Sequence, residues 1–339
     1  MMQTVGRDPR AVVVTGGAGY IGGHACKALA RAGYFPLAFD NLSTGHEWAV
    51  KWGALERGDI LDSPRFVEVL KAHRPIAVMH FAAKAYVGES VERPQEYYRN
   101  NVQGTLSLLS AMVECDVKHL IFSSSCSTYG LPAKLPVDES QPTNPVSPYG
   151  FTKVACERMM ADFERAYGLQ WMALRYFNAA GADPDGEIGE LHDPETHLIP
   201  LALMAADGRL ERLEIYGDDY PTPDGTCIRD YVHVSDLAMG HVQAMEALFG
   251  GRGRGVFNLS TGRGASVRDV IEAVERVTGK RVPIKVGARR PGDAVQLVAD
   301  TTKARQQLGW NAQFTSLDAI VDTAWKWMKH GKPLQASAT

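Results

Sequence analysis

The segment Ala11–Gly22, which reads A-V-V-V-T-G-G-A-G-Y-I-G, indicates the class of fold. An apolar run, Ala11–Thr15, leads directly into glycines at positions 16, 19 and 22, and a helix-like pattern continues to Ala32. A strand, a glycine-rich turn and a helix in this order are typical of a dinucleotide-binding sheet, because glycines let the backbone approach a pyrophosphate and the helix N-terminus favours an anion. Such a turn is also common as a plain β–α connection, so the neighbouring sequence has to support the interpretation.

Outward from this turn, apolar strand-like runs alternate with amphipathic stretches of helical length. The predicted strands are Ala11–Thr15, Phe35–Asp40, Ala77–Phe81, His119–Ser124 and Gln170–Arg175. The predicted helices are Tyr20–Ala32, Pro64–His73, Gln95–Cys115 and Tyr149–Tyr167. This alternation, with strands that are apolar throughout, predicts an α/β fold in which helices cover both faces of a doubly wound parallel, Rossmann-like sheet.

The chain is too long for one core of usual size, with 339 residues, and the alternation weakens after Phe177. Residues 178–195 and 217–225 are rich in glycine, aspartate and proline, and strand-like and helix-like segments resume at Val232–Val234 and Ser235–Phe249. We therefore expect a dinucleotide-binding domain over residues 1–177, with a contribution from about 232–260. A smaller, discontinuous substrate-binding lobe is expected over residues 178–339.

Composition and charge exclude several classes of protein. Apolar residues make up 45% and charged residues 22% of the chain, and 36 basic against 39 acidic residues leave a net charge of −3. We expect no nucleic-acid partner and no membrane association, because no basic block stands out and no apolar run approaches the ~20 residues that cross a bilayer. Residues 1–10 lack the apolar segment of a signal peptide, and the five cysteines show no disulfide or zinc spacing. A reduced, cytoplasmic protein without a metal site is expected.

Two carboxylates follow predicted strands on the dinucleotide side. Asp40 ends the second strand, 18 residues after Gly22, where a carboxylate accepts hydrogen bonds from an adenosine ribose or simply caps the strand end. Residues 41–45 contain no arginine to pair with a 2′-phosphate, so the sequence favours NAD over NADP. Asp59, in the tripeptide G-D-I, suits an adenine edge, although a turn residue is the commoner role of an aspartate there.

A serine run and a Tyr-x-x-x-Lys pair carry the predicted chemistry. The serines Ser123–Ser125 end a strand, and Tyr149 and Lys153 share one face of a predicted helix because they are four residues apart. An ammonium group beside a phenol favours the phenolate and lowers a pKa of about 10 towards neutrality. A strand-end serine can hydrogen-bond both the phenol and a substrate hydroxyl, so the arrangement predicts a proton acceptor. The spacing alone also fits a surface Tyr–Lys pair.

Ordered matches along the chain make the interpretation more specific. The matching stretches are T-G-G-A-G-Y-I-G, D-N-L-S-T-G, G-D-I, H-F-A-A-K-A-Y-V-G-E-S, Y-Y-R-N-N-V-Q-G-T, S-S-S-C-S-T-Y-G, S-P-Y-G-F-T-K, R-Y-F-N-A-A-G-A, Y-P-T-P-D-G-T-C-I-R-D-Y-V-H-V and A-R-R-P-G-D. Together, from Ala11 to Met328, they resemble the extended short-chain dehydrogenase/reductase superfamily and, within it, the UDP-glucose 4-epimerases. The resemblance implies an NAD-dependent isomerase that interconverts UDP-galactose and UDP-glucose through a 4-keto sugar, and a homodimer formed through two helices of the nucleotide domain.

The resemblance also implies roles for individual residues. Tyr149 is expected to take the proton from sugar O4, Lys153 to lower the pKa of that phenol, and Ser125 to be the catalytic serine, with Ser124 as the alternative. The residues implied in NAD binding are Gly16, Gly19, Tyr20, Ile21, Gly22, Asp40, Asn41, Asp59, Ile60, Phe81, Ala82, Ala83, Lys84, Asn100, Ser123, Tyr149, Lys153 and Phe177. Those implied in UDP-hexose binding are Ser125, Ser127, Tyr149, Asn178, His197, Leu198, Ile215, Tyr216, Arg229, Arg290, Asp293 and Leu297.

Departures from the family pattern leave alternatives open. Lys84 is displaced by one position from the lysine of some relatives, and His197 stands where many have asparagine. Leu297 is intermediate between the residues that relatives carry beside the hexose, which predicts some acceptance of N-acetylated UDP-hexoses. A 4-epimerase for UDP-pentoses or UDP-uronates remains an alternative. A 4,6-dehydratase is disfavoured because Cys126 and Ser127 replace its acid pair, and a non-catalytic NAD-binding regulator is disfavoured because the Ser-Tyr-Lys set is complete.

Overall fold

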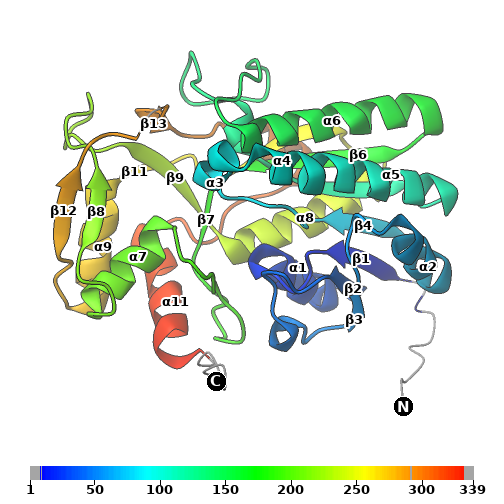
Figure 1. Cartoon of the computed structure of the whole chain (residues 1–339), viewed down its shortest axis with the longest axis horizontal. Helices are drawn as coiled ribbons and strands as arrows, with labels where there is room; N and C mark the ends of the chain where they lie inside the picture. Colours follow the sequence, from blue (N-terminus) through cyan, green and yellow to red (C-terminus); the bar gives the residue numbers. More distant parts are fainter. Residues whose placement is uncertain (1–7, 9, 291, 332–339) are drawn as a thin grey trace.

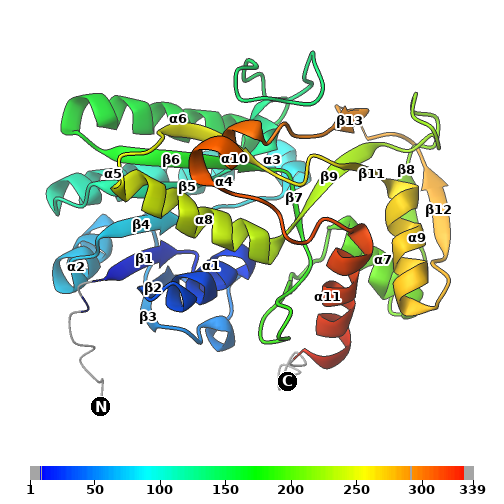
Figure 2. The ribbon, with the colours of Figure 1, turned by 180° about the vertical axis from the view of Figure 1, so that it is seen from behind.

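A computed structural model describes residues 8, 10–290 and 292–331. A large parallel sheet is sandwiched between helices, and a smaller lobe lies beside it (Figures 1 and 2). The order of the large sheet is β10-β6-β5-β4-β1-β2-β3, with all neighbouring strands parallel, which confirms the predicted fold class. Its strands are β1 (Ala11–Thr15), β2 (Phe35–Asp40), β3 (Ala54–Arg57), β4 (Ala77–His80), β5 (His119–Ser125), β6 (Gln170–Tyr176) and β10 (Gly255–Leu259).

Each face of the large sheet has its own apolar core. Val12 and Val14 of β1 lie in one core and Val13 lies in the other, because successive side chains of a strand point to opposite faces. One core is covered by α1 (Tyr20–Arg31), α8 (Val234–Phe249) and α10 (Thr302–Leu308), and the other by α2 (Ser63–His73), α5 (Gly104–Glu114) and α6 (Pro148–Tyr167). Burial on both faces explains why these strands are apolar throughout.

The smaller lobe is assembled from separate segments of the chain. One of its sheets has the order β11-β9-β13, with β7 also paired to β9, and a second pairs β8 with β12. The strands are β7 (Asn178–Ala180), β8 (Leu213–Tyr216), β9 (Ile228–His233), β11 (Gly264–Ser266), β12 (Ile284–Gly287) and β13 (Gln296–Leu297). The helices α7 (Leu198–Ala206), α9 (Val267–Thr278) and α11 (Leu317–His330) close its core. None of the helices in the described parts of the chain combines the length and apolarity needed to cross a membrane.

The helix predicted over Gln95–Cys115 is present, but it contains a π-helical turn. The structure has α3 (Val87–Glu92), α4 (Pro94–Tyr97) and a π-helical turn, Tyr98–Gln103, before α5 begins. A proline lacks the N–H that would continue α3, so the helix restarts at Pro94. The wider turn is accompanied by burial of Asn101, whose side chain bonds to the loop after β4.

The strand predicted at Val232–Val234 is also displaced. The structure starts β9 at Ile228 and begins α8 at Val234, so the chain passes from the smaller lobe to the large sheet without a linker. Short 3₁₀ turns occur at Glu47–Ala49, after β2, and at Cys126–Thr128, directly after β5. The second of these turns follows the serine run and therefore belongs to the candidate site.

Candidate active site

The glycine-rich turn joins β1 to α1 at the carboxyl edge of the large sheet. Gly16 has a φ of 72°, and a Cβ there would lie 2.8 Å from the backbone nitrogen of Ala82, so a side chain is excluded by conformation and by contact. A Cβ at Gly22 would lie 2.1 Å from the carbonyl oxygen of Gly16. Gly19 caps α1 without a side-chain hydrogen bond, and Tyr20 and Ile21 form the first turn of that helix. The N–H groups at this helix end can therefore bind an anion.

Asp40 is fixed against the same turn. Its Oδ2 accepts the N–H of Ala18 at 3.0 Å and its Oδ1 accepts the N–H of Leu42 at 2.8 Å. Burial raises the pKa of the Asp40 carboxyl, and the two backbone hydrogen bonds oppose this effect. Each oxygen keeps a lone pair that a ribose hydroxyl can use.

The neighbouring loops complete the adenosine side of the candidate cofactor groove. The amide of Asn41 donates to Asp59 Oδ2 at 2.9 Å, and Asp59 Oδ1 accepts the N–H of Leu61 at 2.8 Å. Ile60 is buried, and a Cβ at Gly104 would meet it at 2.5 Å. The parallel neighbours β2 and β3 thus bring the predicted residues Asp40, Asn41, Asp59 and Ile60 to one edge.

The loop after β4, Phe81–Lys84, passes over Gly16. Asn101 holds this loop, because its Oδ1 accepts the Lys84 N–H at 2.8 Å and its Nδ2 donates to the Lys84 carbonyl at 2.9 Å. The Lys84 amine is paired with Glu96 at 2.5 Å. The side chain of Asn100, which was predicted to contact the cofactor, donates to Asn101 Oδ1. Sequence reasoning missed the role of Asn101, although the N-N pair contained it.

The predicted catalytic residues come together at the end of β5. Tyr149 occupies the first turn of α6, where Ser147 caps the helix by accepting the N–H of Gly150, and Lys153 follows one turn later. Both side chains are buried. The Lys153 amine donates to the Ser123 carbonyl at 2.7 Å and lies 5.8 Å from the centroid of the Tyr149 ring.

Ser125, and not Ser124, lies beside the phenol. A hydrogen bond from the Ser125 side chain lowers the pKa of Tyr149, although burial, the largest effect, raises it overall. Ser125 Oγ also accepts the N–H of Ser127 at 3.1 Å. Ser124 donates instead to Glu157 at 2.6 Å on the other side of the strand. The alternation of a strand therefore separates the two candidates.

Burial works against the predicted lowering of the phenol pKa by Lys153, which stays a prediction. Burial raises the pKa of Tyr149 well above its usual value, and burial lowers the pKa of Lys153 to about 8. Desolvation penalises the charged form of each group.

Residues that sequence reasoning missed support the end of β5. The Ser123 hydroxyl lies 2.5 Å from the Tyr176 hydroxyl, whose pKa is raised to about 12 by burial. Glu157, one turn after Lys153 on α6, forms a buried ion pair with Arg175 of β6, with Arg175 Nε and Glu157 Oε1 2.9 Å apart. The signal available in the sequence was the position of Arg175 and Tyr176 at the end of the strand that follows the serine run along the chain.

The predicted substrate residues gather where β9 and β13 meet the large sheet. Arg229 forms an ion pair with Asp293, and Leu297 is its register partner on β13. Leu297 belongs to a small apolar cluster that also contains Phe177 and Cys126, so β13 packs against the residue next to Ser125.

The remaining predicted substrate residues lie in the same lobe. The guanidinium of Arg290 lies 3.7 Å from the centroid of the Tyr216 ring. Asn178 on β7 donates to the Asp230 carbonyl at 3.0 Å. Ile215 points into the core of the lobe, so only its backbone is free to contact a ligand.

His197 is engaged by carboxylates of the preceding loop. Its Nδ1 lies 2.9 Å from Glu190 and 2.8 Å from Glu195. Burial lowers the pKa of His197, but the two carboxylates outweigh burial and raise it to about 10. Leu198 follows as the first residue of α7.

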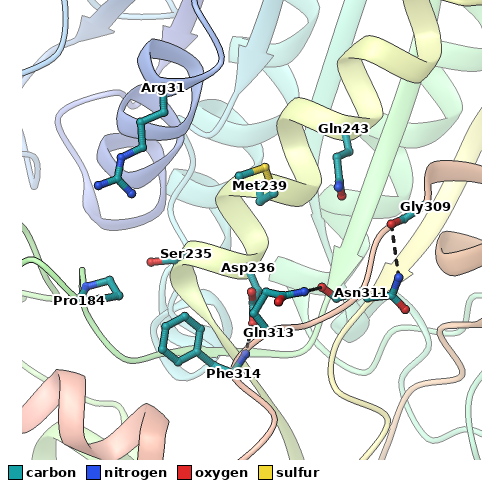
Figure 3. Close-up of a pocket in the computed structure, with 10 residues that line it drawn as sticks. All are labelled: Arg31, Pro184, Ser235, Asp236, Met239, Gln243, Gly309, Asn311, Gln313 and Phe314. Atoms are coloured by element: carbon teal, nitrogen blue, oxygen red, sulfur yellow. Dashed lines mark hydrogen bonds between the residues drawn. The ribbon is translucent and has the colours of Figure 1, made fainter.

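A separate cavity of about 440 Å³ lies between α8 and the segment before α11 (Figure 3). Its lining residues are Arg31, Pro184, Ser235, Asp236, Met239, Gln243, Gly309, Asn311, Gln313 and Phe314. It includes none of the residues selected from the sequence, and we assign it no part in the candidate site.

A glycine turn at the edge of a parallel sheet, with a Ser-Tyr-Lys set beside it, defines a dinucleotide-dependent enzyme of the short-chain dehydrogenase type. Residues 12–260 match the NAD dependent epimerase/dehydratase family, and the chain belongs to this family.

Individual proteins resemble the chain over nearly its whole length. It is 52% identical over 316 residues to a UDP-glucose 4-epimerase of Rhizobium meliloti (strain 1021), which covers 93% of this chain and 96% of the relative. The crystal structure of UDP-glucose 4-epimerase from Brucella ovis in complex with NAD is 56% identical, with a TM-score of 0.92 and coverage of 93% and 97%. The Bifidobacterium longum UDP-glucose 4-epimerase in complex with NAD+ and UDP is 38% identical, with a TM-score of 0.88 and coverage of 94% and 98%.

Proposed function

We propose that the protein is a UDP-glucose 4-epimerase, an isomerase that interconverts UDP-galactose and UDP-glucose by reversible oxidation at sugar C4. The observation that carries this conclusion is the buried Tyr149 phenol beside Ser125, with Lys153 one helical turn away. This set occurs in a chain about half identical to UDP-glucose 4-epimerases over nearly its full length.

The residues at the sheet edge fit NAD. Side-chain-free glycines at positions 16 and 22 and an uncapped start of α1 suit a pyrophosphate, and Asp40 suits an unphosphorylated ribose. NAD, when bound, supplies a hydride acceptor and a positively charged nicotinamide. A positive charge beside Tyr149 would favour its phenolate. Because the oxidation is reversed within each turnover, no added cofactor is consumed.

The protein's own groups handle the proton. Tyr149 accepts it from the sugar O4 hydroxyl and returns it to the 4-keto sugar. Ser125 hydrogen-bonds the same oxygen, and Lys153 remains anchored on the Ser123 carbonyl. Burial of all three side chains excludes water, which protects the ketone and strengthens each electrostatic contact.

The smaller lobe is proposed to bind the UDP half of the substrate. Arg229 and Arg290 supply the cations that a diphosphate requires, and Asp293 supplies a ribose-binding carboxylate. Arg229 and Asp293 already form a pair, so substrate binding requires their hydrogen bonds to be rearranged or shared. We accordingly divide the chain into a nucleotide-binding part, residues 1–177 with 232–260, and a UDP-sugar-binding part from the remaining segments.

We also propose a cytoplasmic homodimer. Tyr98, Leu106 and Phe151 expose 41%, 44% and 50% of their surface on the neighbouring α5 and α6 regions, and the rings of Tyr98 and Phe151 are 6.1 Å apart. A cluster of exposed apolar side chains of this kind favours burial against another protein surface. Helices α5 and α6 lie side by side on one face of the large sheet (Figure 1), and a two-fold dimer would pair this face with itself.

The decisive experiment incubates the purified protein with UDP-galactose without added NAD and follows UDP-glucose by NMR. We expect turnover, bound NAD in the heat-released supernatant, and a loss of at least about 100-fold in kcat for Tyr149→Phe, because the proton acceptor is removed. Tyr167→Phe, at the exposed end of the same helix, is the matched control and is expected to retain activity.

A panel of N-acetylated, pentose and uronate UDP-sugars in the same assay defines the substrate range. Retention of more than a tenth of the activity by Tyr149→Phe would contradict the proposed mechanism. Conversion of another UDP-sugar with no turnover of UDP-galactose would contradict the proposed substrate.

A further inference from the structure

Four side chains between β7 and α7 converge in the described part of the chain. They are Glu190, His192, Glu195 and His197, in the pattern E-x-H-x-x-E-x-H, and one potential ligand atom from each lies within 4.8 Å of the others. His192 Nδ1 is 3.2 Å from Glu190 Oε1 and 3.7 Å from Glu195 Oε2. His197 Nδ1 is 2.9 Å from Glu190 Oε1 and 2.8 Å from Glu195 Oε1. Both imidazoles thus present the same ring nitrogen to the same two carboxylates.

The two carboxylates of the cluster are sheltered from solvent, whereas the His197 side chain is 45% exposed. The side chains of Glu190 and Glu195 are only 8% and 10% exposed. Among the described residues, His192 Nδ1 is a buried polar atom that makes no hydrogen bond, although it faces the two carboxylates. The rings of Tyr20 and Tyr86 lie edge-on to the His192 ring, with centroids 6.2 and 6.1 Å away. Two sheltered carboxylates require a neighbouring cation, which either a protonated imidazole or a metal ion among the four side chains supplies.

A nearby cluster of three carboxylates differs from this one because a lysine neutralises it. Asp183, Asp185 and Glu187 also converge, but the amine of Lys27 already lies among them, at 2.6, 2.8 and 2.6 Å. That group has its cation and offers no place for a metal. In the described part of the chain, Glu190 and Glu195 form ion pairs with the two histidines and with no lysine or arginine.

We propose that Glu190, His192, Glu195 and His197 bind one Zn²⁺ ion. Imidazole and carboxylate ligands suit zinc, and four protein ligands form the closed tetrahedral set of a structural site. Zinc bonds of about 2.0–2.2 Å place neighbouring ligand atoms roughly 3.3 Å apart, within the spread of 2.8–3.7 Å that the four contacts show. The spacing of the cysteines gave no sign of this site, because the ligand set contains no cysteine.

The ion would join the loop after β7 to the start of α7. Glu195 Oε1 already accepts the N–H groups of Thr196 and His197, at 2.7 and 2.8 Å, next to the first turn of that helix. The proposed zinc therefore fixes the position of Leu198, the first residue of α7. Its role is structural, and its detection does not depend on epimerase activity.

The test measures metal content directly. Untagged protein, expressed with zinc present and dialysed against metal-free buffer, is analysed by inductively coupled plasma mass spectrometry. We expect about one zinc per chain in the wild type and less than about 0.1 in His192→Ala and in Glu195→Gln. The glutamine keeps an oxygen that can accept the two backbone N–H groups, so this variant is designed to fold. His330→Ala, an exposed histidine at the end of α11, is the control and should keep its zinc.

Two further measurements remove dependence on a single variant. Protein stripped with a chelator should show a rise in Tm of several degrees when Zn²⁺ is added, because a ligand that binds the native state stabilises it. Co²⁺ added to stripped wild type should give the intense visible absorption of a tetrahedral site, absent in Glu195→Gln. Zinc well below one per chain together with no Tm response would overturn the proposal and leave protonated histidines as the partners of the carboxylates. Equal zinc in wild type and both variants would also overturn it.

Discussion

Tyr149 and Lys153 have pKa values that burial moves in opposite directions. The phenol is made a weaker acid, and the pKa of the amine falls to about 8. Both shifts favour neutral side chains, whereas the proposed chemistry uses the phenolate and benefits from an ammonium group. Residues with such conflicting requirements are typical of catalytic sites, where stability is sacrificed for function.

The shifted pKa of Lys153 predicts a specific dependence of stability on pH. Between pH 8 and the ordinary lysine value of 10.5, the unfolded chain holds a proton that the folded protein lacks, so the folded state gains stability as pH rises through this window. Lys153→Met has no such group. We expect the unfolding free energy of the wild type to increase relative to that of Lys153→Met by about 2 kcal/mol from pH 7.5 to 9.5.

Urea titrations monitored by circular dichroism at the two pH values measure this difference. Lys326→Met, at an exposed ion pair of α11, controls for buffer and denaturant effects. A difference between wild type and Lys153→Met that stays constant from pH 7.5 to 9.5 would show that the amine keeps its ordinary pKa when folded.

For individual residues, the sequence predicted contacts within one helix or strand better than contacts between neighbouring strands. The four-residue spacing of Tyr149 and Lys153 places them on one helix face, and the serine run is correctly located at the end of a strand. Tyr176 was missed because its contact with Ser123 depends on the register of β5 with β6. The effect of burial on the pKa of the phenol could not be foreseen, because spacing along the chain does not show burial.

At the scale of elements, the π-helical turn Tyr98–Gln103 links the loop after β4 to α6. It carries Asn101, which pairs with both backbone groups of Lys84 and donates to Thr152 of α6 at 3.1 Å. The turn thereby connects the loop after β4 to the helix that carries Tyr149. A widened turn inside a helix is often found at a functional site.

Substitutions of the two adjacent asparagines test the contribution of Asn101 to stability. Asn101→Ala leaves the N–H and carbonyl of Lys84 without their partner, and we expect it to lower the free energy of unfolding by about 2–4 kcal/mol. Asn100→Ala is the matched control. The Asn100 amide donates to the Asn101 side chain and to no backbone group of the described chain, so we expect a loss under about 1 kcal/mol. Chemical denaturation measures both, and equal losses would contradict a special role for Asn101.

The strands of the large sheet were predictable and the turn was not. A short apolar run between two helical segments, such as Ala11–Thr15, indicates a buried strand. The residues around Asn101 fit ordinary helix periodicity, and only the tertiary contact with Lys84 distinguishes them. Strands of two or three residues, such as β13 and β11, carry too little pattern to reveal their order around β9.

At the scale of the whole molecule, the exposed apolar side chains on α5 and α6 predict the assembly. We expect the wild type to sediment as a dimer at micromolar concentration and Phe151→Asp to sediment as a monomer, because a buried charge at a symmetric interface occurs twice. Analytical ultracentrifugation measures the mass of each.

Val286→Asp is the control, because Val286 is similarly exposed on β12 of the smaller lobe, away from α5 and α6. Dimerisation of Phe151→Asp with wild-type affinity, or loss of the dimer in Val286→Asp, would place the interface elsewhere.

The position of β10 in the large sheet affects how the protein is made. This strand pairs with β6, yet it leaves the ribosome about eighty residues later, after much of the smaller lobe. Until then a nascent chain ending near residue 180 displays the edge of β6 and a face that α8 has not yet covered. The segment up to β6 and the segment that carries α8 and β10 therefore need each other to complete the large sheet. If the gene were split between them, we expect the separate fragments to aggregate unless they are expressed together or bound by a chaperone.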